Sequence, residues 1–372
     1  MIERIALHNF KAFDYAEISL TELNLFTGMN GMGKSTFIQS LLLLRQATQN
    51  NNTESLRSGL PLKGQLIEIG NGKDAQNIHA EDNTLGFEIG FQDQSKLSVQ
   101  YNFIADSDFL SCFEVDYNEK EMEFQSLFSK GKFQYLNAER KSPSNTFLGS
   151  NSQVTQQRSL GKHGEYTVHF IAHNQREPLS NPSLILDGVQ NTLLDQIDAW
   201  FGRITPNTHL KATYFQELDI AKLTYSFGSG ANSTGEFTPI NVGFGFTYVL
   251  PVITAVLAAR KGDLVIIENP ESHLHPQGQA QLGELFAMAA EGGVQLIVET
   301  HSDHLLNGIR VAVKQKKIEP EKVSIFYFER DEESDEHITK IIQPIVDIDG
   351  RLSRQPKGFF DEYAKQLDQL IQ

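Results

Sequence analysis

A glycine-rich segment with a lysine and two hydroxyl residues is the part of the sequence best suited to chemistry. Residues 28–36 read GMNGMGKST, which matches the pattern G-x-x-x-x-G-K-[ST] between a strand pattern and a helix pattern. Glycines let the backbone N–H groups of such a turn surround a polyphosphate. Lys34 would then reach the β- and γ-phosphates, and the Ser35 hydroxyl would bind Mg²⁺. We predict that ATP and Mg²⁺ bind here, through Asn30, Gly31, Met32, Gly33, Lys34, Ser35 and Thr36.

A second group of polar residues follows an apolar run in the later part of the chain. Residues 266–276 read IIENPESHLHP. Glu268 lies where a buried strand should end, which is the position of the acid that holds Mg²⁺ in P-loop ATPases. Glu271 follows at a spacing that would let it act on the attacking water. We therefore assign the metal to Ser35 and Glu268, and the handling of water to Glu271.

A histidine follows the next apolar run, in the segment LIVETHSDH. His301 could hydrogen-bond the γ-phosphate, and Glu299 lies just before it. The predicted catalytic residues are thus Glu268, Asn269, Glu271 and His301. His273, His275, His301 and His304 also have spacings seen among zinc ligands. The P-loop already accounts for their positions and no cysteine is near them, so we favour Mg²⁺ over zinc.

These residues need a sheet whose strands end at one edge, and the apolar pattern predicts such a sheet. Residues 2–27 contain two strand patterns, followed by the glycine-rich turn and a helix of about 14 residues from Lys34. From residue 235 onward, helix patterns (251–260, 278–290, 303–317) alternate with strand patterns (264–267, 294–299, 323–328). This alternation indicates an α/β fold with a mainly parallel sheet covered on both faces, as in a P-loop NTPase.

The middle of the chain has a different pattern. Strand-like segments alternate with polar turns, as in TLGFEIGFQ, KLSVQYNFI, EYTVHFIAHN and AKLTYSFGSG. We predict a mobile loop at residues 142–158 and a hairpin with a solvated acidic tip in the segment FYFERDEESDEHITKII. We expect an N-terminal part of the ATPase head (1–74), a β-rich inserted lobe (75–235), a C-terminal part of the head (236–345) and a helical tail (346–372).

Composition and charge limit the class of protein and its partners. The chain is 40% hydrophobic and 21% charged, as soluble globular proteins are, and its apolar runs are too short to span a bilayer. A single cysteine, Cys112, fits a reducing cytoplasm. The net charge of −15 opposes broad DNA coating. Lys314, Lys316 and Lys317 could form a local basic patch, although positive charge at a helix C-terminus is the favoured interpretation.

Taken together, these motifs resemble the ATPase head of the ABC superfamily, in its RecF/SMC/OLD-like branch. The chain is similar to stand-alone bacterial AAA-type ATPases that end in a short uncharacterised segment and are often found in phage-defence operons. The matching segments are IALHNFKAF, LFTGMNGMGKST, IIENPESHLHP, VETHSDHLLNGIR and GFFDEYAKQLDQLI. NAERKSP and LGKHGEY look like further family motifs in the middle. The resemblance therefore extends over nearly the whole chain.

The resemblance implies that two heads close face to face on two ATP molecules, as a homodimer or a higher even oligomer. Each head would offer a signature segment to its partner's nucleotide, and INVGFGFTYVLPV lies at that place. Gly243 and Gly245 could present backbone N–H groups to a γ-phosphate. The serine usual in such signatures is absent, so a polar contact from its side chain is not expected. Two alternatives are a packing role for the glycines and hydrophobic dimer contacts through Phe244 and Phe246.

The segment after Glu268 departs from the usual ABC pattern. The residue after this acid is usually a catalytic glutamate, but here it is Asn269, which cannot accept a proton at neutral pH. Glu271 is then the preferred base, and the alternative is slow hydrolysis in which ATP acts mainly as a clamp. His273 and His275 would lie in a loop that contacts the other head. Gln46 and Gln65 are weak candidates for the glutamine that ABC ATPases use near the metal.

The resemblance favours an ATP-driven switch that dimerises and controls a separate effector, a nuclease or a protease, in anti-phage defence. A DNA-binding or DNA-processing ATPase of RecF or OLD type is the alternative. OLD nucleases carry a further domain with a D-x-D acid cluster, which DIDG at 347–350 matches only superficially. Only 22 residues follow Gly350, so we interpret DIDG as a polar turn. A transporter subunit is disfavoured by the signature segment.

Overall fold

The computed structural model divides into two compact units. It describes residues 1–48, 53–122, 125–228, 233–330, 339–354, 356, 359 and 362–371. Unit 1 comprises Met1–Ser129, Ser324–Ile345 and Arg354–Gln372, and unit 2 comprises Lys130–Val323 and Val346–Ser353. The segment predicted as one middle lobe is thus shared between the two units.

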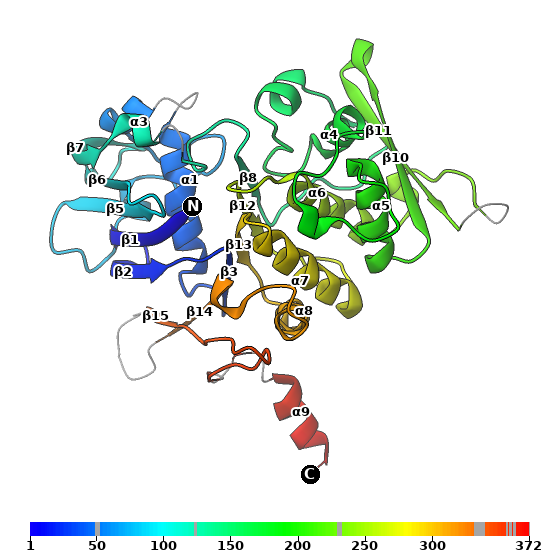
Figure 1. Ribbon diagram of the computed structural model, residues 1–372. Helices are drawn as coiled ribbons and strands as arrows, with labels where there is room; N and C mark the ends of the chain where they lie inside the picture. The colour runs from blue at the N-terminus through cyan, green and yellow to red at the C-terminus, as the bar shows by residue number, and fades with distance from the viewer. Residues whose placement is uncertain are drawn as a thin grey trace. The chain divides into compact units, whose positions relative to one another are not determined.

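Unit 1 contains an antiparallel sheet in the order β2-β1-β5-β6-β7-β4, with α1 against it (Figure 1). Its strands alternate buried and exposed residues, because one face covers the core and the other faces solvent. The bounds are β1 Ile2–Phe10, β2 Phe13–Ser19, β4 Gly59–Pro61, β5 Thr84–Phe91, β6 Lys96–Asn102, β7 Phe109–Tyr117 and α1 Lys34–Ala47. Two short helices, α2 Gly72–Ala75 and α3 Glu119–Met122, lie in the connections.

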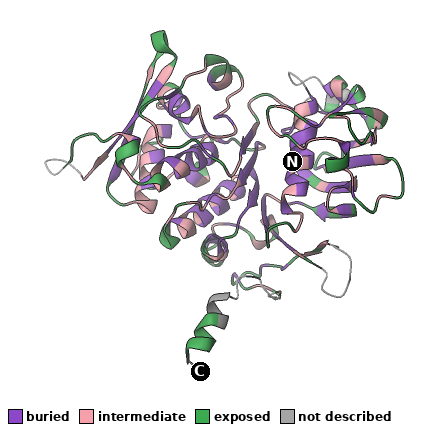
Figure 2. Ribbon diagram, turned by 180° about the vertical axis from the view of Figure 1, so that it is seen from behind, coloured by how far each residue is buried: buried purple, intermediate pink, exposed green. Residues whose placement is uncertain are grey.

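Three further strands of unit 1 are neighbours in the order β15-β14-β3. They are β3 Leu23–Gly28, β14 Val323–Arg330 and β15 Thr339–Ile342, and β3 leads directly into the glycine-rich turn. β14 and β15 pair antiparallel, as the predicted hairpin requires, while its tip at 331–338 lies outside the described residues. The C-terminal helix α9, Glu362–Ile371, exposes residues 366–370 (Figure 2).

Unit 2 is built around the parallel strands β13-β12-β8. β8 is Phe133–Leu136, β12 is Leu264–Glu268 and β13 is Gln295–Glu299. Nearly every residue of β12 and β13 is buried, which explains the continuous apolar runs in their sequences. The helices α6 Phe244–Ala258, α7 Pro276–Glu291 and α8 Asp303–Lys314 belong to this unit, and α7 and α8 lie side by side (Figure 1). The predicted mixed α/β fold with parallel strands is confirmed.

The rest of unit 2 comprises a small sheet and two helices. The sheet has the order β10-β11-β9, with β9 Phe147–Leu148, β10 Thr208–Phe215 and β11 Ile220–Phe227. The helices are α4 Thr167–Asn174 and α5 Leu193–Ile204. Short 3₁₀ turns in the two units are Thr53–Arg57, Pro182–Leu184, Gln216–Leu218, Pro239–Asn241 and Pro320–Lys322.

Two sequence predictions for this region were wrong. EYTVHFIAHN forms α4 rather than a strand, because a short apolar run that is buried on most sides has the same pattern in either state. Residues 142–158 form β9 and a π-helical turn, Ser152–Gln156, rather than a loop throughout. Backbone pairing with β11 and the burial of Val154 hold this polar segment in place.

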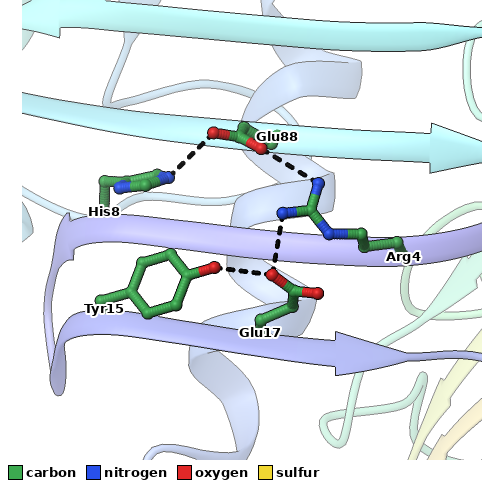
Figure 3. Close-up of polar contacts among 5 residues, drawn as sticks. All are labelled: Arg4, His8, Tyr15, Glu17 and Glu88. Atoms are coloured by element: carbon green, nitrogen blue, oxygen red, sulfur yellow. Dashed lines mark hydrogen bonds and ion pairs between the residues drawn. The ribbon is translucent and has the colours of Figure 1, made fainter.

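A network of charged side chains covers part of the exposed face of the unit 1 sheet (Figure 3). Arg4 on β1 donates to Glu17 on β2 at 2.8 Å and to Glu88 on β5 at 3.0 Å. Tyr15 donates to Glu17 at 2.6 Å, and His8 lies 3.1 Å from Glu88. The network links three neighbouring strands through their side chains.

Candidate functional site

The glycine-rich turn has the backbone geometry that its sequence predicts. Gly28, Gly31 and Gly33 have φ values of 135°, 78° and 80°, which side chains other than glycine rarely adopt. Helix α1 begins immediately afterwards at Lys34, and no side chain caps its N-terminus within the described structure. The predicted helix of about 14 residues from Lys34 is therefore confirmed.

Lys34 is buried within this turn. Its side chain is 3% exposed, and Nζ donates to the carbonyl oxygens of Gly28 at 3.0 Å and Met29 at 2.7 Å. Asn30 and Gly31 are exposed at the tip of the turn, while Met32, Gly33 and Ser35 are half-buried and Thr36 is buried. A lysine ammonium beside the N-terminus of a helix is an arrangement that attracts phosphate.

Two neighbouring segments explain why this turn needs glycines. A Cβ atom on Gly28 would collide with the carbonyl oxygen of Phe328 on β14. A Cβ atom on Gly33 would lie 3.0 Å from the ring of Phe13. The segment IALHNFKAF therefore supports the turn through Phe13, which gives this N-terminal motif a structural reason.

The acidic segment after β12 forms a compact polar group in unit 2. The hydroxyl of Tyr135 donates to Oε1 of Glu268 at 3.0 Å, and the backbone N–H of Ala138 donates to Oε2 at 3.2 Å. Burial raises the pKa of Glu268, while these two hydrogen bonds and Arg140 oppose that rise. Carboxylate and hydroxyl oxygens are the ligands that Mg²⁺ prefers, so Glu268 and Ser35 fit the predicted ion chemically.

Glu271 and His301 are held together in this group. The backbone N–H of His301 donates to Oε1 of Glu271 at 2.8 Å. Oε2 of Glu271 is buried and has no hydrogen-bond partner among the residues that the structure describes. This hydrogen bond uses the backbone of His301. The residue is exposed, and its imidazole takes no part in the contact. Glu271 thus has one oxygen fixed and one buried oxygen without a partner in the described structure.

Asn269 has an unusual backbone at the end of β12. Its φ is 44°, although it precedes Pro270, a position where extended backbone is favoured. Its N–H donates to the carbonyl of Glu299 at 2.8 Å, so the turn is joined to the end of β13. In the described part of the chain, Oδ1 of Asn269 is buried without a hydrogen-bond partner.

Sequence reasoning missed one member of this group, Arg140. Its side chain is 2% exposed and donates to the carbonyls of Glu268 and Asn269. The motif NAERKSP, which contains it, is paired with LGKHGEY. Asn137 donates to the carbonyl of Lys162 at 2.9 Å, and Lys141 donates to that of His163 at 2.8 Å. In the sequence, the only signal was that NAERKSP and LGKHGEY look like family motifs; their pairing is visible only in the structure.

The signature-like segment contacts the turn that follows Glu271. Gly243 is the N-cap of α6, which begins at Phe244, earlier than the predicted helix. A Cβ atom on Gly245 would lie 2.6 Å from the carbonyl oxygen of His273, so Gly245 has a packing role. The exposed ring of Phe244 lies near those of His273 and Tyr248, while Phe246 packs on Phe201 and Tyr225.

The remaining candidates have structural partners. Oε1 of Gln46 accepts from the backbone N–H groups of Leu66 and Ile67, each at 3.1 Å, and Gln65 is exposed. Nδ1 of His275 accepts from the N–H of Gln277 at the start of α7. Lys317 pairs with Glu284 at 2.6 Å. Within the described ranges, no group of three or more His, Cys, Asp or Glu residues is arranged to hold a metal ion.

Comparisons with known proteins agree on a head-type ATPase fold. Two solved SMC heads match it: one bound to the C-winged helix domain of ScpA, and one from Pyrococcus furiosus with an extended coiled coil, bound to the C-terminal domain of ScpA. The first has 12% identity and a TM-score of 0.52 over 93% of this chain and 98% of that one. The second has 10% identity and a TM-score of 0.51 over 100% and 99%.

Sequence families match most of the chain. Residues 23–307 match the AAA domain described as putative AbiEii toxin, Type IV TA system, and residues 318–370 match a protein family of unknown function, DUF3696. The curated proteins contain no match. None of the described helices is long and apolar enough to span a membrane. The chain therefore belongs to the AAA domain family described as putative AbiEii toxin, Type IV TA system, and its fold is similar to that of SMC heads.

Proposed function

We propose that this protein is an ATP-driven switch that binds MgATP, closes as a head-to-head dimer and opens after hydrolysis. The observation that carries the proposal is the conjunction of a formed P-loop around Lys34 with a Glu271 carboxylate that has one oxygen fixed and the other available. The first feature binds phosphate, and the second handles a water molecule.

Glu271 is the proposed base. It would take a proton on Oε2 from a water molecule as the water oxygen bonds to the γ-phosphorus. The bond from that phosphorus to the β,γ-bridging oxygen breaks, and ADP and phosphate result. Asn269 would orient the water, and His301 would fix the base through its backbone N–H. Mg²⁺, held by Ser35 and Glu268, would neutralise charge on the phosphates.

Dimerisation and effector control form the wider part of the proposal. The N-terminus of α6 at Gly243 is exposed, and Phe244 beside it is 56% exposed. Exposed backbone N–H groups and an exposed aromatic side chain suit contact with a second head and its nucleotide. The SMC head in one matched structure binds a winged-helix domain of ScpA. By analogy, we propose a separate effector protein, a nuclease or a protease in bacterial anti-phage defence, with the switch in the cytoplasm.

Nucleotide binding gives the first test. We expect Lys34→Ala to weaken MgATP binding about 10- to 100-fold, because a charged hydrogen bond contributes about 1.5–3 kcal/mol. Titration calorimetry with MgATP measures the change. Lys63→Ala is the matched control in the same unit, since Lys63 forms an exposed ion pair with Asp108 at 3.6 Å.

Two outcomes would contradict the proposal. Unchanged MgATP affinity in Lys34→Ala would remove the assigned nucleotide site. Mg²⁺-dependent cleavage of plasmid DNA by highly purified protein would favour the DNA-processing alternative over a switch that acts through a partner.

A further inference from the structure

Arg140 is a buried cation whose hydrogen bonds go to backbone rather than to a carboxylate. Nη1 donates to the carbonyl of Asn269 at 3.0 Å, and Nη2 donates to the carbonyl of Glu268 at 2.6 Å. Nε is buried with no hydrogen-bond partner in the described structure. Burying a guanidinium is costly. An arginine that served stability alone would be expected to use its fork of donors on a carboxylate, whereas Arg140 uses it on two backbone carbonyls.

The two carbonyls that Arg140 binds belong to the strained turn. Asn269 combines a φ of 44° with a following proline, and such backbone persists only when its surroundings impose it. Arg140 holds the turn on its carbonyl side, and the N–H of Asn269 is bonded to Glu299. Together these contacts fix where the chain goes next, which is toward Glu271.

Arg140 is itself held in a defined position. Its neighbours Asn137 and Lys141 are bonded through their backbone N–H groups to Lys162 and His163. Nδ1 of His163 lies 2.6 Å from the carbonyl oxygen of Glu139. The loop of LGKHGEY thus braces the segment on both sides of the arginine, so the guanidinium has little freedom to move away.

The charge of Arg140 also acts on the acids. Burial lowers the pKa of Arg140 to about 10, and the negative charges of Glu271 and Glu268 oppose this change. The guanidinium therefore stays protonated at neutral pH, and its charge opposes the rise that burial causes in the pKa of Glu268.

We propose that Arg140 is a positioning residue for ATP hydrolysis: it fixes the Glu268–Asn269 turn and so aims the Glu271 carboxylate at water. This inference rests on the proposed ATPase function. Arg140 touches neither nucleotide nor water in the proposal, and its effect passes through the backbone of the turn.

The test compares Arg140→Lys and Arg140→Gln with wild type. A lysine keeps the charge but cannot bind both carbonyls in a fork, so we expect kcat to fall about 100-fold, as displacement of a catalytic group by about 1 Å can cause. MgATP affinity should stay within about twofold of wild type, since the P-loop is untouched. Arg158→Lys is the matched control, because Arg158 in the same unit donates instead to the carbonyl of Ala258 at 3.1 Å.

A double mutant separates positioning from a general structural role. In a Glu271→Gln background, Arg140→Lys should add little further loss of kcat, because both changes disable the same step. Full additivity would overturn the proposal, as would unchanged kcat in both Arg140 variants or failure of both to fold. If wild type binds and hydrolyses no ATP, the proposed function itself fails, and that result is distinct from the others.

Discussion

At the scale of single residues, the two acids of the candidate site differ in how many of their carboxylate oxygens already accept a hydrogen bond. Glu268 has both carboxylate oxygens hydrogen-bonded, whereas Glu271 has one bonded oxygen and one buried oxygen without a partner in the described part of the chain. These different environments fit the roles that we propose, Glu268 as a metal ligand and Glu271 as a proton acceptor. The sequence alone marks both as acids near a strand end, but the assignment of roles requires the hydrogen bonds.

Prediction from sequence worked for residues whose role follows from local backbone chemistry. The P-loop glycines were predictable because a phosphate-binding turn requires positive φ and close backbone approach. Arg140 was not predictable in the same way. Its partners, the carbonyls of Glu268 and Asn269, lie more than 120 residues away in sequence, and only the parallel pairing of β8 with β12 brings them together.

A residue-scale prediction concerns Glu17 in the surface network. Its hydrogen bond from Arg4, with a smaller effect from Tyr15, lowers the pKa of Glu17 to about 2. A carboxyl group whose folded pKa is lowered stabilises the fold above its unfolded pKa of about 4.3, and that stabilisation is lost as the pH falls toward about 2. Glu17→Gln should therefore cost up to about 1 kcal/mol at neutral pH, because the pair is exposed.

Urea unfolding of wild type and Glu17→Gln at several pH values measures this difference. The gap between the two proteins should be constant at pH values well above about 4.3 and should shrink as the pH falls from about 4.3 toward about 2. Glu22→Gln, at a half-buried position outside the network, serves as the control. A gap that is constant with pH would show that the carboxylate charge of Glu17 does not contribute.

At the scale of elements, the patterns of apolar residues located most of the strands and helices that carry the site. β12 and α1 begin where predicted, because a fully buried strand reads as a continuous apolar run and the P-loop fixes the helix start. α4 and the start of α6 were not located, since a helix that is apolar on nearly all sides has no useful period. The burial of these two helices within unit 2, rather than a periodic sequence pattern, determines where they form.

An element-scale prediction concerns the contact of α6 with the turn at His273. Gly245→Ala would place a Cβ atom 2.6 Å from the carbonyl oxygen of His273, so the turn or the helix must shift. We expect a loss of about 1–3 kcal/mol in the free energy of unfolding, as in other overpacked sites. Chemical denaturation measures it.

Gly243→Ala provides the matched control for this contact. There the nearest atom to an added Cβ is in the ring of Phe246, at 3.8 Å, which is ordinary van der Waals contact. Equal stability losses in the two variants would contradict a specific role for Gly245 in the approach of α6 to His273.

At the scale of the whole molecule, the functional residues are divided between two compact units. The P-loop belongs to unit 1, whereas Glu268, Glu271, His301 and Arg140 belong to unit 2. We propose that the switch uses both units, because the candidate phosphate-binding residues and the candidate water-handling residues belong to different ones.

The most direct test of the central claim is the oligomeric state and turnover of Glu271→Gln with MgATP. Glutamine keeps the shape of the side chain but cannot accept the proton, so hydrolysis should fall by at least about 100-fold while ATP binding persists. Analytical ultracentrifugation should then find a dimer that is stable with MgATP and dissociates with MgADP. A turnover rate equal to that of wild type, or a monomer in saturating MgATP, would contradict the account.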